Sequence, residues 1–137
     1  MKLSNYKKSS VVDTYSKVES ALSGYGFATT HGLDFDFIAI QFSETIAIDL
    51  ISTDKTDLVL NDIVSLDTFY KLQNAKERIG IREVGIVIYS SKLETFKFLP
   101  YQLLNSLGEY EYYNVAISVS QLPNFSSELN KRRQVAV

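Results

Sequence analysis

Carboxylates are the side chains of this sequence that could hold a metal ion. The 137 residues include 16 Asp and Glu, but no Cys and only one His. This excludes disulfides, zinc–thiolate sites, iron–sulfur clusters and multi-histidine metal centres. Carboxylate oxygens favour hard ions such as Mg²⁺ or Mn²⁺. Any metal chemistry in this chain is therefore expected to rest on Asp and Glu.

The other residue types that often carry out catalysis lack the neighbours they need. His31 could act as a general base near neutral pH, but it stands in a predicted turn with no neighbouring acid to orient it. We therefore interpret it as a turn or surface residue. The sequence contains no Gly-x-Ser-x-Gly motif and no glycine-rich phosphate loop, so neither serine hydrolysis nor P-loop nucleotide hydrolysis is indicated.

The composition predicts one cytoplasmic globular domain over residues 1–137. Hydrophobic residues make up 45% and charged residues 22%, an ordinary balance for a folded domain. No segment approaches the roughly 18 apolar residues of a membrane span, and no apolar signal region follows the first lysines. The net charge of −2 does not favour nucleic acid by itself, so a binding face would need local basic clusters or oligomerisation.

The first part of the chain predicts one helix and then three strands. Apolar residues at helical spacing indicate a helix over residues 9–24, where Gly24 ends the run. The following β-prone segments are joined by short turns, which predicts an antiparallel meander. The three strands are expected at residues 27–30, 36–42 and 45–51.

The second part predicts helices alternating with strands, after an ambiguous polar segment at residues 54–61. Right-handed crossovers would place the last strands parallel to a neighbour. The core is expected over about residues 9–120, with a polar tail over 121–137. The predicted fold is an α/β three-layer sandwich around a mixed sheet, in the order α-β-β-β-α-β-α-β. The later elements are expected at 66–79 (helix), 84–89 (buried strand), 93–107 (mainly helix, interrupted by Pro100) and 114–119 (strand).

This order resembles the PD-(D/E)XK, or restriction-endonuclease-like, fold over about residues 11–119. The sequence support is Asp-Phe-Asp-Phe-Ile-Ala-Ile-Gln-Phe-Ser-Glu-Thr-Ile-Ala-Ile-Asp-Leu-Ile at residues 34–51. Asp36 before an apolar strand looks like the family's first acid, and Asp49 looks like the second. In that family, two carboxylates hold a metal ion against the scissile phosphate and a lysine helps to activate water. The lysine should stand two residues after the second acid, where this chain has Ile51.

The resemblance implies a site in which Asp36 and Asp49 are catalytic acids and ligands for Mg²⁺ or Mn²⁺. Many members place a glutamate of the first helix near the metal, which nominates Glu19 as a third ligand. Asp34 is an alternative to Asp36 as the residue that corresponds to the family's first acid. Asp36 is preferred because it directly precedes the apolar strand.

Three lysines are candidates for the cation that Ile51 does not supply. Lys55 follows the strand, and Lys71 and Lys76 stand on the next predicted helix. At about 100° per residue, Lys76 falls inside the apolar stripe of that helix and Lys71 well off it. Lys76 is therefore named as the catalytic lysine, and Lys71 is expected to be a solvated surface residue. The alternative is that the fold has lost its chemistry.

Two clusters bear on partners. The basic residues Lys131, Arg132 and Arg133 near the C-terminus could contact nucleic-acid phosphates. Aromatic residues gather over 98–113 and are expected to pack or to form a homodimer contact. A homodimer also fits the resemblance, since a small fold of this type often needs two copies to embrace a duplex.

Two main functions remain open at this point. One is a PD-(D/E)XK-like nuclease acting on DNA or structured nucleic acid. The other is a non-catalytic nucleic-acid-binding or assembly subunit of the same fold, and an α/β protein-interaction domain is a third possibility. The nuclease interpretation requires Asp36 and Asp49 to converge with a lysine ammonium.

Overall fold

The computed structural model describes residues 8–32, 34–41, 44–78, 81–107 and 116–135, without the side chains of 8–13, 31–32 and 131–135. The elements in chain order are α1 (Lys8–Gly24), β1 (Ala28–Gly32), β2 (Phe35–Gln41), β3 (Glu44–Thr53), β4 (Asp57–Val59), α2 (Leu60–Ile63), α3 (Leu66–Lys76), β5 (Ile81–Ser90), β6 (Thr95–Pro100), α4 (Tyr101–Ser106), β7 (Ala116–Ser118), the 3-10 helix η2 (Val119–Gln121) and α5 (Phe125–Val135).

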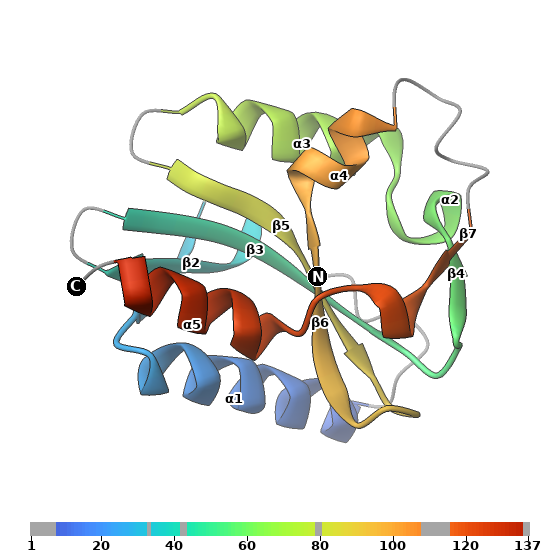
Figure 1. The fold of residues 1–137 in the computed structure, drawn as a ribbon, viewed down its shortest axis with the longest axis horizontal. Helices are drawn as coiled ribbons and strands as arrows, with labels where there is room; N and C mark the ends of the chain where they lie inside the picture. The colour runs from blue at the N-terminus through green and yellow to red at the C-terminus, as the bar shows by residue number, and fades with distance from the viewer. Residues whose placement is uncertain (1–7, 33, 42–43, 79–80, 108–115, 136–137) are drawn as a thin grey trace.

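A five-stranded mixed sheet forms the middle layer, in the order β1-β2-β3-β5-β6. The first three strands are the antiparallel meander that the sequence predicts. Strand β5 then lies parallel to β3, as expected for a crossover through the intervening helices. Figure 1 shows α1 and α5 covering one face of the sheet, and α3 and α4 covering the other. The predicted three-layer mixed α/β fold is confirmed.

The core has two halves because side chains of the central strands alternate between the faces of the sheet. On β3, Ile48 and Leu50 pack toward α1 and α5, whereas Ala47 and Ile51 pack toward α3 and α4. Both faces are covered, so residues 46–51 are all buried. Asp49 is the one charged residue in this run, and its burial marks it for closer attention.

The predicted helix at residues 93–107 is largely wrong. Residues Thr95–Pro100 form strand β6, which pairs antiparallel with β5, and only Tyr101–Ser106 is helical. Phe96 and Phe98 contact the α1/α5 half of the core, while Leu99 contacts the other half. This alternation is that of a strand. The expected second parallel crossover is therefore absent from the described sheet, and a hairpin takes its place.

The polar tail expected over residues 121–137 contains helix α5, which belongs to the core. Phe125 and Leu129 lie one helical turn apart, so they share a face, and they are 3% and 1% exposed. The Phe125 ring packs 5.8 Å from that of Phe98. The core thus extends beyond the expected limit at residue 120. Strand β7 lies within the predicted 114–119 segment but pairs with β4 in a separate two-stranded sheet.

No helix in the described ranges is both long enough and apolar enough to cross a membrane.

Candidate functional site

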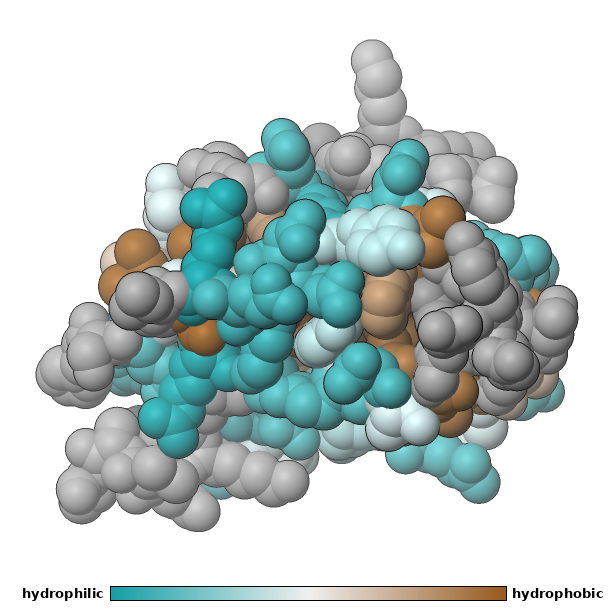
Figure 2. All heavy atoms as spheres, turned by 90° about the horizontal axis from the view of Figure 1, so that it is seen from above, coloured by the Kyte–Doolittle hydropathy of each residue, from teal (hydrophilic) through white to brown (hydrophobic). Residues whose placement is uncertain are grey.

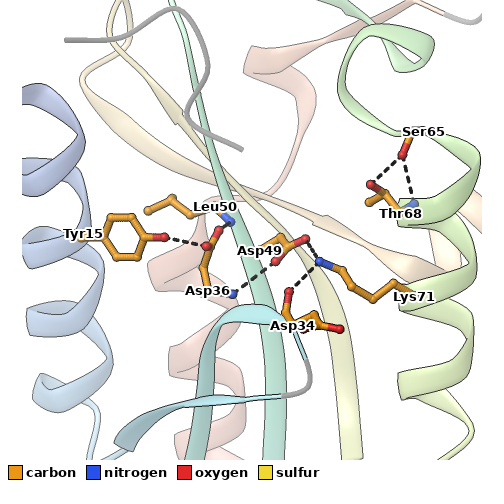
Figure 3. A network of polar contacts seen from close by, with 8 residues as sticks. All are labelled: Tyr15, Asp34, Asp36, Asp49, Leu50, Ser65, Thr68 and Lys71. Carbon is orange, nitrogen blue, oxygen red and sulfur yellow. Dashed lines mark hydrogen bonds and ion pairs between the residues drawn. The ribbon is translucent and has the colours of Figure 1, made fainter. Parts of the chain in front are cut away.

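Asp36 and Asp49 meet where strands β2 and β3 run side by side. Phe37 pairs with Ile48, which places Asp36 opposite Asp49 one step further along. The backbone N–H of Asp36 donates to Asp49 Oδ1 at 3.2 Å, and the N–H of Leu50 donates to Asp36 Oδ2 at 2.8 Å. Each carboxylate therefore accepts an N–H from the other strand, which fixes the two acids relative to one another (Figure 3).

Helix α1 contributes Tyr15 to the Asp36 side of this pair. The Tyr15 hydroxyl donates to Asp36 Oδ1 at 2.5 Å, and its ring packs 5.2 Å from that of Phe37. Burial raises the pKa of Tyr15 far above its ordinary value, and the hydrogen bond to Asp36 and the charges of Asp36 and Asp49 raise it further. Tyr15 is thus held in its protonated form, as a donor that orients the Asp36 carboxylate.

Helix α3 contributes Lys71 to the Asp49 side. The Lys71 ammonium donates to Asp49 Oδ2, and it donates to the backbone carbonyl of Asp34 at 3.0 Å. It also lies 4.6 Å from the centre of the Phe35 ring. The Asp49 side chain is only 3% exposed, and a buried carboxylate requires such a partner to remain charged. Figure 3 shows the acids between α1 and α3, with Tyr15 and Lys71 approaching from opposite sides.

The N-cap and the buried face of α3 position the helix that carries Lys71. Ser65 is the N-cap, and its side chain accepts a hydrogen bond from the Thr68 N–H at 3.1 Å. The buried residues of the helix are Thr68, Leu72 and Ala75. Lys71 is three residues after Thr68 and four before Ala75, so it lies beside this buried stripe. That position brings its ammonium to the sheet instead of to open solvent.

The expectation that Lys71 is a surface residue is therefore wrong, for a physical reason. The sequence predicts a stripe along Phe69, Leu72, Lys76 and Ile79, which include the larger apolar side chains of the segment. The helix is instead rotated so that the small residues Thr68 and Ala75 face the sheet. A pattern of small buried residues carries little hydrophobic signal, although Thr68 and Ala75 flank Lys71 at helical spacing.

Ile51 occupies a fully apolar environment. It lies on the same face of β3 as Asp49, since the two are separated by one residue, and it is 4% exposed within the α3/α4 half of the core. A lysine there would have to bury its stem among apolar side chains. The cation beside Asp49 comes instead from the helix that covers this face.

The remaining lysine candidates lie elsewhere. The Lys76 ammonium donates to the backbone carbonyl of Arg82 at 2.6 Å and not to either acid. Lys55 is exposed after β3, where its backbone N–H donates to Thr53 Oγ1. Neither side chain joins the two acids in the described structure.

The side chains of the other two acidic candidates, Glu19 and Asp34, are exposed. Glu19 is exposed on α1, and the described residues contain no group of three or more His, Asp or Glu side chains that could hold a metal ion. Its role as a third ligand stays a prediction. The Asp34 side chain is also exposed. Its backbone has a φ of 64°, a left-handed conformation that Asp tolerates, and its carbonyl accepts the Lys71 ammonium.

Several other predicted features fall partly outside the described residues. The side chains of His31, Lys131, Arg132 and Arg133 lie outside, although their backbone is described. His31 is on strand β1 and not in the turn that the sequence predicts, and the other three are on α5. The aromatic cluster over 98–113 is described only up to residue 107, where Phe98 and Tyr101 are both buried.

The donor set of Asp36 and Asp49 fits a hard divalent ion. Mg²⁺ is commonly bound by one or two carboxylates, with substrate oxygens and waters completing its shell. A carboxylate offers about four acceptor positions, and Asp49 accepts from two donors of the chain. Asp49 can therefore accept a metal ion as well as the Lys71 ammonium.

The fold is similar to that of Hjc, a Holliday junction resolvase from the archaeal hyperthermophile Archaeoglobus fulgidus. The TM-score is 0.66 and the sequence identity 16%, over 88% of this chain and 98% of that chain. No family model matches this sequence, and no curated protein matches it. At this identity the similarity concerns the fold alone. The chain therefore has the restriction-endonuclease-like fold that its order of elements resembles.

Proposed function

We propose that this protein is a metal-dependent nuclease that cleaves DNA, with Asp36, Asp49 and Lys71 in its active site. One observation carries the proposal. The two acids lie opposite one another on adjacent strands, and a lysine ammonium contacts the second acid. The PD-(D/E)XK resemblance implies the same charged groups, two acids and a lysine. Here the lysine is Lys71 of α3, because position 51 is an isoleucine.

Asp36 and Asp49 would hold Mg²⁺ or Mn²⁺ between the strands and the scissile phosphate. Once bound, such an ion lowers the pKa of its water and offsets charge on the phosphate oxygens. The protein's own contribution is geometric. Backbone N–H groups from both strands and the Tyr15 hydroxyl hold the carboxylates in place, so little reorganisation is needed when the substrate arrives. Tyr15 is in this sense a positioning residue for Asp36.

Lys71 is suited to stabilising the charge that develops on a phosphate. An ammonium group has three N–H donors, and the Lys71 contacts with Asp49 and the Asp34 carbonyl use two of them. The third is available for a phosphate oxygen. The Lys71 side chain is 23% exposed, so it is not closed off from the surface.

We further propose branched DNA as the substrate and a homodimer as the active form. The structural neighbour is described as a Holliday junction resolvase, which makes a four-way junction the first substrate to test. A single copy has one such site, and cleaving two strands symmetrically calls for a two-fold pair. The basic residues of α5, Lys131, Arg132 and Arg133, are proposed to contact phosphates outside the site.

Cleavage of a four-way junction and of plasmid DNA, with Mg²⁺ or Mn²⁺, tests the proposal. We expect the wild type to cleave, and Asp49→Asn and Lys71→Met each to lower the rate by roughly a hundredfold or more. Lys76→Met is the matched control on the same helix and should keep wild-type activity. Equal activity of the wild type and Asp49→Asn would contradict the proposal, because the cleavage would then come from another site or a contaminant.

A second candidate is a non-catalytic DNA-binding or assembly subunit. It is favoured by the chain's own use of the acids, whose oxygens accept two backbone N–H groups, the Tyr15 hydroxyl and the Lys71 ammonium. In this case Asp36 and Asp49 join the strands to the helices without performing chemistry. Junction binding by a wild-type protein that cleaves nothing with either metal would select this candidate.

A further inference from the structure

A groove of about 460 Å³ opens beside Lys71, between α3 and the start of β2. This volume falls in the range of about 300–1,000 Å³ that is usual for ligand sites. Figure 2 looks down on the layer formed by α3 and α4, where hydrophilic side chains cover most of the coloured surface and hydrophobic ones show between them. Because Lys71 lines the groove and also contacts Asp49, whatever binds here lies next to the proposed active site.

The groove has an apolar floor and an aromatic wall. Phe35 and Ala75 line it and are 5% and 3% exposed, so the bottom of the groove is formed by tightly packed apolar residues. Tyr70 also lines it and is 49% exposed. An exposed aromatic ring beside an apolar floor suits a flat heterocycle, since base–aromatic stacking needs only a π face.

Polar side chains continue along the same side of α3. Asn74 lies one turn after Tyr70, and Arg78 follows one turn later, just past the helix end. Both are exposed, and among the residues that the structure describes neither side chain has a hydrogen-bond or ion-pair partner. An amide such as that of Asn74 can donate and accept at once, which matches the edge of a nucleobase.

The charges around the groove do not favour a bare polyanion as its ligand. Asp34 and Asp67 line it together with Lys71 and Arg78, so the formal charges cancel. Lys71 is moreover already paired with Asp49. The ligand that suits this lining is flat and neutral, with an anionic group only at the Lys71 end and at the Arg78 end.

We propose that this groove binds an unstacked nucleobase of the DNA strand, adjacent to the phosphate at Asp49 and Lys71. Tyr70 stacks on the base, Asn74 bonds to its edge, and Arg78 contacts a neighbouring phosphate. The inference rests on the proposal that the chain acts on DNA, and it narrows the substrate class. A base stacked inside a continuous duplex cannot offer its face to Tyr70, so DNA with an unpaired nucleotide at the cleavage point is preferred over fully paired DNA.

Binding in Ca²⁺ separates this proposal from catalysis. Fluorescence anisotropy is measured with two labelled DNAs of the same sequence context, a duplex with a one-nucleotide bulge and the fully paired duplex. We expect Tyr70→Ala to weaken binding of the bulged DNA by about 5- to 150-fold, the value of one base–aromatic stack, and to leave the paired duplex unchanged. Tyr70→Phe keeps the ring and should keep the preference.

Leu66→Ala is the matched control, because Leu66 is an exposed apolar residue of the same helix that does not line the groove. It should bind both DNAs like the wild type. A second measurement places the fluorescent base 2-aminopurine at the bulge. Its emission should fall on binding to the wild type and to Tyr70→Phe, and should fall less on binding to Tyr70→Ala, because only the first two provide a ring for stacking.

Two results would overturn the inference. Either Tyr70→Ala binds the bulged DNA as tightly as the wild type, or it weakens binding of both DNAs equally, as a general loss of surface would. A protein that keeps the Tyr70-dependent preference but cleaves nothing in Mg²⁺ or Mn²⁺ retains the groove and loses the nuclease proposal. Cleavage that depends on Asp49 but not on Tyr70 supports the nuclease proposal and contradicts the role of the groove.

Discussion

Lys71 and Asp49 form an ion pair that joins helix α3 to strand β3 across 22 residues of sequence. The carboxylate is buried, with 3% of its side chain exposed, whereas 23% of the lysine side chain is exposed. Removing Lys71 should cost more stability than the net contribution of the pair suggests, because Asp49 is then left as a buried and uncompensated charge. It therefore links the stability of the fold to the integrity of the candidate site.

Replacing Lys71 should destabilise the protein through Asp49. We expect Lys71→Met to lower the free energy of unfolding by about 1–3 kcal/mol, less than for a fully buried pair because Lys71 is partly exposed. The double variant with Asp49→Asn should recover part of this loss, because no buried charge is then left unpaired. Urea denaturation measures both, with Lys76→Met as the control expected within about 0.5 kcal/mol of the wild type. Strictly additive losses would show that the pair is not coupled.

Tyr15 should make stability fall at high pH. Its pKa in the folded protein is raised above the ordinary value of 10.0, first by burial and then by Asp36. Below about pH 10 both states keep the proton and the contribution is complete. At higher pH the unfolded chain loses the proton first, so the free energy of unfolding decreases. The stability advantage of the wild type over Tyr15→Phe should thus be larger at pH 8 than at pH 11, as measured by urea denaturation.

Metal binding should stabilise the protein independently of any cleavage. A ligand that binds only the folded state adds RT ln(1 + [L]/Kd), which is about 1.4 kcal/mol at a metal concentration tenfold above Kd. We expect Mn²⁺ to raise the midpoint of thermal unfolding of the wild type, and to leave that of Asp36→Asn and Asp49→Asn unchanged. A shift of equal size in all three proteins would place the ion elsewhere on the surface.

Gly85 should be required for the close approach of β5 to β6. A Cβ atom added there would lie 2.7 Å from the Leu99 carbonyl oxygen and 2.7 Å from the Phe98 ring. We therefore expect Gly85→Ala to cost about 1–3 kcal/mol of stability through overpacking. Gly24→Ala is the matched control, because no atom lies within 4 Å of an added Cβ there. Thermal or urea unfolding of the two variants should separate them clearly.

The part of the fold that could be predicted from sequence is the part with strong periodicity. The α1 stripe and the apolar strands of the meander predict elements that the structure contains, and Asp36 and Asp49 stand on two of these strands. The buried run in β5 was equally clear. In these segments local propensity and final environment agree, so no tertiary information is needed.

The rest depended on packing that the sequence does not display. Strand β6 carries Phe96 and Phe98 on one face, but only its pairing with β5 selects the strand over a helix. Helix α5 looks polar in the sequence because its contact with the described core rests on only two apolar residues, Phe125 and Leu129. Lys71 was misplaced for a related reason, since the rotation of α3 follows from Thr68 and Ala75, whose small side chains carry little hydrophobic signal.

Because the lysine of the candidate site is on α3 and the two acids are on the sheet, the site is complete only when α3 is packed against the sheet. A lysine on β3 would accompany its acid from the moment the meander formed. Here the ammonium arrives only when the crossover is complete and α3 has docked against the sheet. A local opening that lifts α3 away would separate Lys71 from Asp49 while leaving the β2–β3 pairing in place. Partly folded or locally opened chains would consequently lack the complete set of charges, which restricts any chemistry to the fully assembled domain.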